Sequence, residues 1–215
     1  MKSGFLVMLR CKSVLLTALL GVTLAGCGGK IQYPNYYILS LPAPPSAQRT
    51  APILGSVAIR EFTAPGFLTG SAIAYRPSPE QIGFYDYHRW AEDPRHAVAA
   101  AVVREIESRG VFQSVDLFDG RSSPAYIVSG RLDHLEEVDG RDAVSIEASL
   151  SAKLTEVASG KVLWQGSSTE TTKLDQRSMA GVVAEMSRDV SVAVERLVSS
   201  MQDRILSQGS LNFER

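Results

Sequence analysis

Residues 144–155 alternate without a break between apolar and polar side chains, and no other part of the chain constrains the fold as tightly. Successive side chains of a β-strand point to opposite faces of its sheet. The pattern therefore predicts a strand with one buried face and one wet face, as in an antiparallel sheet. The apolar positions are Val144, Ile146, Ala148, Leu150, Ala152 and Leu154, and the polar ones are Ser145, Glu147, Ser149, Ser151, Lys153 and Thr155.

Turn residues on both sides of this strand predict that it is the middle of three. Asp139-Gly140 before it is a two-residue hairpin turn, and Ser159-Gly160 after it is a second turn. The flanking segments supply apolar residues for the same face, namely Tyr126, Val128 and Leu132 before the first turn and Val162, Leu163 and Trp164 after the second. We therefore expect a three-stranded antiparallel meander.

Two helices are expected from apolar spacing. Asp93-Pro94 combines an N-cap with a first-turn proline, and Gly110 ends the apolar stripe that follows. A second helix, about 178–206, has a longer stripe and spans roughly 42 Å at 1.5 Å per residue. Core packing explains that stripe best, and contact with a partner stays open. Its members are Met179, Val183, Met186, Val190, Ala193, Leu197, Met201 and Ile205.

The segments before the meander complete the expected fold. Residues 54–62 read as a strand, 71–75 and 81–87 as a hairpin or a pair of edge strands, and 115–118 as a short strand. Together these elements predict an α+β fold. We expect an antiparallel-rich sheet, made of the meander plus N-terminal strands, with two amphipathic helices packed on one face.

The N-terminus carries a targeting signal. Lys2, Arg10 and Lys12 precede an apolar run of about thirteen residues, which is too short to span a membrane. The run ends in Leu24-Ala25-Gly26-Cys27, which resembles the lipobox of bacterial lipoproteins. The resemblance implies cleavage between Gly26 and Cys27, a diacylglycerol on the thiol and an acyl chain on the new amine. A buried cysteine beside an ordinary secretory signal is the alternative.

Removing the signal changes the composition. The whole chain has 22 basic and 23 acidic residues, and three basic residues and no acids leave with residues 1–26. The mature chain then carries 19 basic and 23 acidic residues, a net charge of −4, which gives no reason to expect nucleic acid. Cys11 also leaves, so no free thiol is expected. Gly28 in place of an acidic residue favours the outer membrane over the inner one.

We divide the chain into four parts. Residues 1–26 are the signal peptide, and 27–52 are a lipidated N-terminus and a tether with five prolines. Residues 53–207 form a periplasmic α+β domain, and 208–215 form a flexible tail.

The sequence offers no catalytic or metal site. His88, His96 and His134 lack the spacing of paired metal ligands, and no nucleophile elbow or phosphate loop occurs. Neighbouring residues alternate across a strand, so Asp133-His134 cannot act as a relay and Glu136-Glu137 is a poor acid–base pair. We therefore expect a protein that is not an enzyme, with no cofactor apart from the acyl groups on Cys27. Tyr85, Tyr87 and Trp90 form an aromatic cluster that we interpret as a loop anchor.

The order of short motifs resembles one family. Tyr36-Tyr37-Ile38-Leu39 is followed by a proline-rich stretch and the strand residues Val57-Ala58-Ile59. Arg89-Trp90-Ala91-Glu92-Asp93-Pro94 then opens a helix, Gly110-Val111-Phe112 follows it, and an amphipathic helix ends the chain. Together with the lipobox, this order resembles the ABC-type transport auxiliary lipoproteins of the PqiC-like type, from about Tyr36 to Leu206.

The resemblance implies a periplasmic domain that works beside an ABC permease, its ATPase and an MCE-type protein that moves lipids or other apolar molecules. It also implies a possible homo-oligomer and possible lipid cargo. The family supplies no catalytic residues. Cys27 carries over as the lipidated residue, and Tyr36, Tyr37, Trp90 and Pro94 carry over as motif positions with structural roles.

Three other functions remain open at this point. The same anchor and domain would serve an outer-membrane assembly or scaffolding lipoprotein. A periplasmic hydrolase could be built on Asp86 and His88 near the aromatic cluster. The space between sheet and helices could itself hold a lipid.

Overall fold

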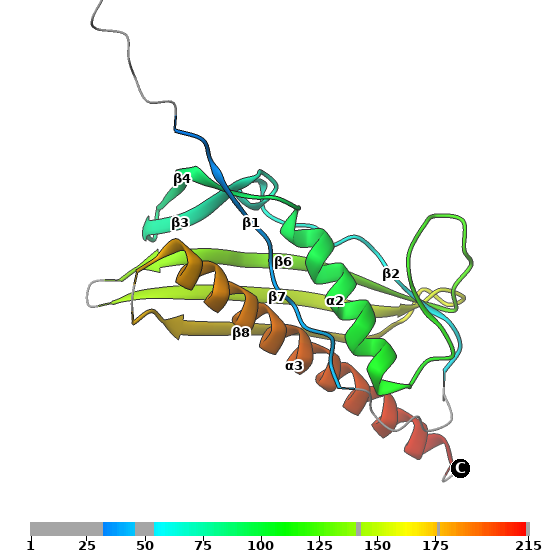
Figure 1. The fold of residues 1–215 in the computed structure, drawn as a ribbon. Helices are drawn as coiled ribbons and strands as arrows, with labels where there is room; N and C mark the ends of the chain where they lie inside the picture. Colours follow the sequence, from blue (N-terminus) through cyan, green and yellow to red (C-terminus); the bar gives the residue numbers. More distant parts are fainter. Residues whose placement is uncertain (1–31, 46–53, 141–142, 176, 214–215) are drawn as a thin grey trace, which may run out of the picture. The chain divides into compact units, whose positions relative to one another are not determined.

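The structure, a computed structural model, describes residues 32–45, 54–140, 143–175 and 177–213, and the side chains up to residue 207. The chain divides into two compact units, residues 1–33 and 34–215, and every described helix and strand belongs to the second. In chain order (Figure 1) its elements are β1 (Asn35–Tyr37), β2 (Val57–Ile59), the 3-10 helix η1 (Gly66–Leu68), β3 (Ala72–Ser78), β4 (Gln81–Trp90), α2 (Pro94–Arg109), β5 (Val115–Leu117), β6 (Tyr126–Asp139), β7 (Val144–Glu156), β8 (Val162–Lys173) and α3 (Met179–Phe213).

The expected meander is present as β6, β7 and β8, which pair antiparallel along almost their whole lengths. Gly160 turns the chain between β7 and β8 with a φ of 69°, which a residue without a side chain adopts easily. The prediction of a two-residue turn at Asp139-Gly140 is wrong. Asp139 is still paired with Val144, so the connection comprises residues 140–143, and Gly140 N–H donates to the Ala143 carbonyl at 3.0 Å.

Among the described residues the sheet has eight strands. It is rich in antiparallel pairs, as expected, because the meander and the β3–β4 pair are antiparallel, but it also contains parallel pairs and is therefore mixed. Parallel pairs join β1 to β4, β2 to β5, and both β2 and β3 to β6. The reason is the length of β6. Its 14 residues leave room for β2 beside its first residues and for β3 beside its last ones, on the edge that β7 does not use.

Both helices pack on one face of the sheet, as expected (Figure 1). Asp93 accepts a hydrogen bond from the Arg95 N–H at 2.9 Å and so caps α2, and Gly110 ends α2 with a φ of 65°. Met186, Val190 and Leu197 of α3 are at most 3% exposed. The stripe of α3 therefore belongs to the core. The helix continues to Phe213, into the stretch for which we expect a flexible tail.

Residues 35–45 pack on the domain, although 27–52 was expected to be a tether. We call residues 35–45 the N-terminal strap. Strand β1 pairs with β4, and Leu39 is buried. The N–H of Ser40 donates to Ser187 Oγ of α3 at 3.1 Å, and Arg104 Nη2 of α2 donates to the Leu41 carbonyl at 3.0 Å. The compact unit therefore begins near residue 34, well before the expected boundary at 53.

Candidate functional site

The domain buries two adjacent glutamates, Glu136 and Glu137, and both are fully inaccessible. In the β6–β7 register Glu137 lies beside the core residue Ile146, while Glu136 lies beside Glu147. Register neighbours share a face, so Glu137 faces the helices and Glu136 faces the other way. A buried carboxylate is costly unless it is paired, and each glutamate has an arginine partner.

The first cluster, which we call the Glu137 cluster, consists of Tyr85, Glu137, Asp139 and Arg177. The Tyr85 hydroxyl donates to Glu137 Oε2 at 2.9 Å. Arg177, between β8 and α3, forms an ion pair with Glu137 and another with Asp139 Oδ1 at 3.2 Å. The cluster therefore ties the middle of β4 and the end of β6 to the segment just before α3.

Burial raises the pKa of Tyr85 to about 12, and the adjacent Glu137 carboxylate also raises it against the opposing effect of Arg177. The pKa of Arg177 is raised because its guanidinium lies against the Tyr85 hydroxyl and near the carboxylates of Glu137 and Asp139. At neutral pH the phenol thus keeps its proton and Arg177 stays charged. The buried Glu137 carboxylate is therefore held between a phenol and a guanidinium.

The second cluster surrounds Glu136 on the opposite face. Arg76 Nη2 of β3 lies 2.6 Å from Glu136 Oε1, and His134 Nδ1 lies 2.9 Å from the same oxygen. Glu136 Oε2 accepts the N–H of Leu135 at 2.9 Å. His134 therefore works with Glu136 in place of Asp133, its neighbour in sequence. The missed signal was a pair of adjacent acids near the end of a long, largely buried strand, because each acid buried there requires a cation.

An aromatic chain joins the strap to the Glu137 cluster. The Tyr37 hydroxyl lies 3.0 Å from His88 Nδ1, and the rings of His88 and Tyr85 lie 5.8 Å apart. Tyr75 continues the chain, with its ring 5.0 Å from that of Tyr85. In the described part of the chain, Asp86 makes no hydrogen bond or ion pair with His88.

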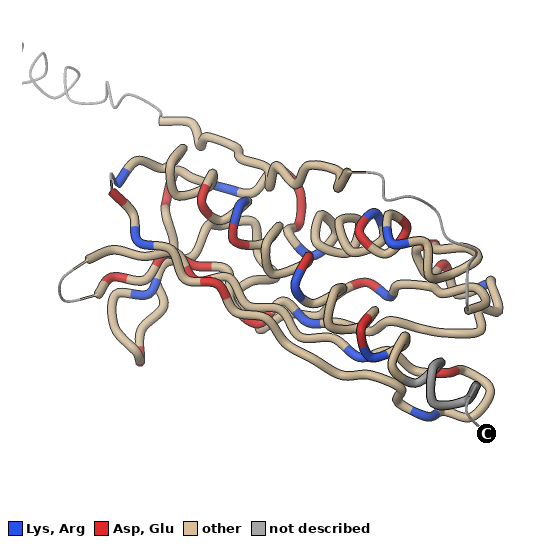
Figure 2. Tube along the Cα trace, turned by 90° about the horizontal axis from the view of Figure 1, so that it is seen from below, with Lys and Arg blue, Asp and Glu red and all other residues tan. Residues whose placement is uncertain are grey.

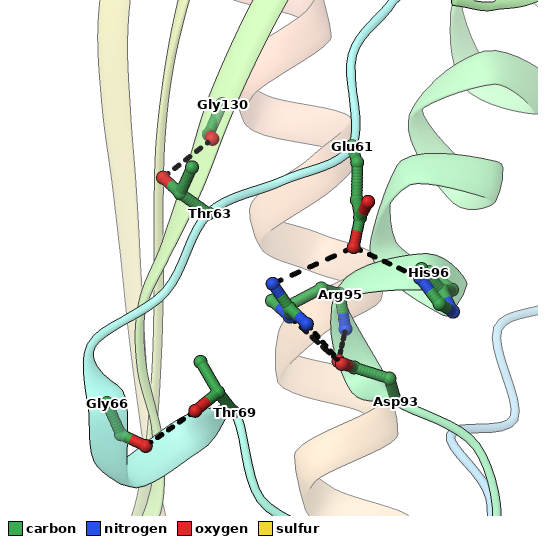
Figure 3. A network of polar contacts seen from close by, with 8 residues as sticks. All are labelled: Glu61, Thr63, Gly66, Thr69, Asp93, Arg95, His96 and Gly130. Carbon is green, nitrogen blue, oxygen red and sulfur yellow. Dashed lines mark hydrogen bonds and ion pairs between the residues drawn. The ribbon is translucent and has the colours of Figure 1, made fainter. Parts of the chain in front are cut away.

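Trp90 and Pro94 are both buried where β4 leads into α2. Figure 3 shows the polar network at this point. Arg95 Nη2 lies 2.6 Å from Asp93 Oδ2, and Glu61 Oε1 lies 3.1 Å from His96 Nε2. Burial alone would raise the pKa of Asp93, but hydrogen bonds from the side chain and backbone of Arg95 hold it below its ordinary value. This network fixes the start of α2.

A groove of about 520 Å³ lies between the strap, α2 and α3. Glu105 and Arg109 of α2 form an ion pair of 2.6 Å in its wall, and Arg109 Nη1 also donates to Gln202 Oε1 of α3 at 3.3 Å. The groove is open and has a mostly apolar lining. That lining includes Leu41, Pro42, Pro44, Ala101 and Val194.

One carboxyl in the contact between α3 and β8 is left partly unsatisfied. Asp189 is 3% exposed, and its Oδ1 accepts a hydrogen bond from the Thr172 hydroxyl at 2.8 Å. Its Oδ2 has no hydrogen-bond partner among the residues that the structure describes. Burial raises the pKa of Asp189, and the nearby Glu185 and Glu170 raise it further. Asp189 therefore tends to keep a proton that an exposed aspartate would lose.

The expected lipidation and cleavage positions, Cys27 and Gly26, lie outside the described residues. Within those residues, no group of three or more His, Cys, Asp and Glu side chains is placed to hold a metal ion. None of the described helices combines the length and apolar character needed to cross a membrane. Figure 2 shows acidic and basic residues interspersed along the described chain.

The motif positions of the domain meet at one place. Tyr37 lies in register with Trp90 across β1 and β4, and Tyr36 lies in register with Arg89. Tyr37 contributes to the aromatic chain, while Tyr36 is 63% exposed. The two tyrosines of one motif therefore have different environments, which the sequence alone did not separate.

These features define a two-layer α+β domain that follows a lipobox-like motif in the sequence. The family model of the ABC-type transport auxiliary lipoprotein component matches residues 37–198. The chain belongs to this family, and its association with an ABC transport system follows at the level of the family. The curated proteins include no sequence similar enough to match it.

Two solved structures have the same fold, and a third is less similar. Protein XCC0632 from Xanthomonas campestris is 18% identical with a TM-score of 0.68, and the match covers 81% of this chain and 99% of that one. An uncharacterized protein is 13% identical with a TM-score of 0.61, covering 79% and 99% of the two chains. The PelC dodecamer from Paraburkholderia phytofirmans is 15% identical with a TM-score of 0.46, covering 72% and 94%.

Proposed function

We propose that this chain is a lipid-anchored periplasmic subunit, without catalytic activity, of an ABC transport system that includes an MCE-type protein. The cargo is a lipid or another apolar molecule, and the anchor is the acylated Cys27, in the outer membrane. The observation that carries the proposal is the family match over residues 37–198, which begins ten residues after the lipobox cysteine.

The titratable groups of the domain support a non-catalytic role. The two inaccessible glutamates are each neutralised by an arginine, and His88 and His134 are hydrogen-bonded to Tyr37 and Glu136. A general base needs a free lone pair near an open site, and a nucleophile needs a base beside it. The clusters stabilise the joints between strands and helices, which suits a rigid docking subunit.

Transport of an apolar molecule across the periplasm requires a route that shields it from water, because each exposed methylene costs about 0.8 kcal/mol. A subunit held at one membrane can attach such a route to that membrane. The domain offers an open groove between the strap and two helices as a place where another protein chain could dock.

The test is affinity purification of the tagged full-length lipoprotein from membranes solubilised in mild detergent. The proposal expects a permease, its ATPase and an MCE-type protein to co-purify. Recovery of only outer-membrane assembly proteins would contradict it and favour the scaffolding alternative. The Cys27→Ala variant is the matched control, because it keeps the domain and loses the acceptor of the lipid. Homo-oligomerisation stays a prediction, and the mass of the purified particle measures it.

A further inference from the structure

Four large apolar side chains are exposed on the neighbouring strands β1 and β4 and the residue after β1. Tyr36 and Ile38 are 63% and 61% exposed, and Phe84 and Tyr87 are 46% and 42% exposed. In this compact unit no other pair of adjacent strands exposes as many large apolar side chains among the described residues, because the remaining ones lie singly on other elements. We call Tyr36, Ile38, Phe84 and Tyr87 the edge patch.

The outward direction of Tyr36 and Ile38 follows from the strap. Tyr37 turns inward to His88, and Leu39 is buried against the core. Alternation along an extended chain then points Tyr36 and Ile38 away from the domain. Strand β1 pairs only with β4 among the described strands, so it forms an edge of the sheet. No element of the described chain covers these two side chains.

The position of β1 in the chain limits how far the edge patch can lie from the expected anchor. Tyr36 is nine residues after Cys27. A fully extended chain covers about 3.4 Å per residue, so the two residues can be at most about 31 Å apart. A tether ending at residue 52 would have allowed about 85 Å by the same measure. Packing of the strap therefore keeps the domain close to the membrane that holds Cys27.

The chemistry of the edge patch fits the boundary between lipid headgroups and acyl chains. Tyrosine has an apolar ring and a polar hydroxyl, and it is enriched at membrane interfaces for this reason. Arg89 lies beside Tyr36 in register, and a guanidinium is the kind of group that pairs with a lipid phosphate. The nearby Asp86 and Glu92 are also exposed, so apolar contact must provide the attraction in place of net charge.

We propose that the edge patch rests in the headgroup region of the bilayer that carries the acylated Cys27. This inference depends on the lipidation included in the proposed function. The anchor supplies a high local concentration of bilayer, so contacts too weak to bind a free protein suffice. The β1–β4 edge then faces the membrane, and the opposite end of the meander points into the periplasm.

Spin labels test this orientation in the full lipoprotein. Cys11 leaves with the signal and Cys27 is acylated, so an introduced cysteine is the only reactive thiol. Tyr36→Cys and Ile38→Cys place the label on the edge patch. Val157→Cys is the matched control, because Val157 is 48% exposed. It follows β7, and its N–H donates to the carbonyl of Ala125 just before β6, whereas β3 pairs with the other end of β6. The proteins are reconstituted in phosphatidylcholine–phosphatidylglycerol vesicles, and the accessibility of each label to oxygen and to a water-soluble nickel complex is measured.

The expected result is a severalfold higher oxygen-to-nickel accessibility ratio at residues 36 and 38 than at 157. Equal, water-like ratios at all three positions on vesicle-bound protein would overturn the inference, because the edge patch would then lie outside the bilayer. Mass spectrometry of the N-terminal peptide separates this failure from a failure of the proposed function. An unmodified Cys27 would contradict the proposed lipid anchor, and with it the proposed orientation of the edge patch toward the membrane.

Discussion

The meander with α3 and the N-terminal part of the sheet are stabilised in different ways. Ile146, Leu150 and Leu154 of β7 are fully buried against α3, and neighbouring strands there follow one another in sequence. The N-terminal strands β1 and β3 pair in parallel with distant partners, and buried ion pairs and tyrosine contacts hold them. Apolar packing stabilises the first region through burial from water, whereas ion pairs and hydrogen bonds fix the orientation of the strands in the second. The first region is therefore a rigid base, and the second is the part that orients the strap.

The largest effect is expected from truncating the apolar base. Leu150→Ala should lower the free energy of unfolding by about 2–5 kcal/mol, because it removes a fully buried side chain and leaves a cavity. Urea denaturation of the detergent-solubilised protein measures the change. Leu117→Ala is the control, because Leu117 is 54% exposed and its loss should change little. Equal losses from both variants would show that the meander is not the base.

The next effect comes from the Glu137 cluster. Tyr85→Phe should lower the free energy of unfolding by about 1.5–3 kcal/mol, because the hydroxyl donates to a buried carboxylate. Tyr87→Phe on the same strand should be nearly neutral, since Tyr87 is 42% exposed.

Alkaline denaturation of the same variant sharpens this prediction. The folded pKa of Tyr85 is about 12, above the ordinary value of 10.0, so the unfolded chain releases its proton first. Stability should then fall as the pH rises from about 10 to about 12. The Tyr85→Phe variant should lack that part of the loss. An unchanged alkaline profile would show that the phenol does not contribute in this way.

A smaller effect is expected at the start of α2. Asp93→Ala should cost about 1 kcal/mol, because it removes the N-cap and the partner of Arg95. The pKa of Asp93 is lowered in the fold, so the contribution of its charge should be lost as the pH falls from the ordinary aspartate value to the lowered one. Thermal unfolding at pH 7 and at acidic pH measures both effects. Glu92→Ala, one residue earlier and exposed, is the control.

The smallest change in the free energy of unfolding is expected at Asp189, where a substitution should stabilise the fold. Asp189 has a raised pKa, so the folded state holds the proton more tightly and stability falls as the pH rises past the ordinary aspartate value. Asp189→Asn keeps an acceptor for Thr172 and removes the buried charge. It should therefore be slightly more stable than the parent at pH 7 and lose this advantage at acidic pH. A loss of stability at neutral pH would show that the charge is needed.

Local patterns predicted much of the fold. The alternation in residues 144–155 predicted β7, the turns around it predicted the meander, and Asp93-Pro94 with Gly110 predicted both ends of α2. The parallel pairs of β2 and β3 with β6 were not predicted, because they depend on which edge of β6 is free. That choice involves residues more than fifty positions apart, and no short pattern records it.

The candidate site was less predictable than the fold. Glu136-Glu137 suggested only that the two side chains face opposite ways, which the register confirms. Their arginine partners come from β3 and from the segment before α3, 60 and 40 residues away. Tyr36 and Tyr37 are equivalent in the sequence, and only the pairing of β1 with β4 exposes one and turns the other toward His88.

The sequence by itself determined most of the helices and strands and the family, because alternation, caps and short motifs are each contained within a few residues. Only the tertiary structure decided that the strap packs on α2 and α3 and so shortens the link to Cys27. The five prolines of residues 28–52 argue against a helix but are equally compatible with a free tether and with an extended strap. Hydrogen bonds with Ser187 and Arg104, which lie far along the chain, hold residues 35–45 as an extended strap and not as a free tether.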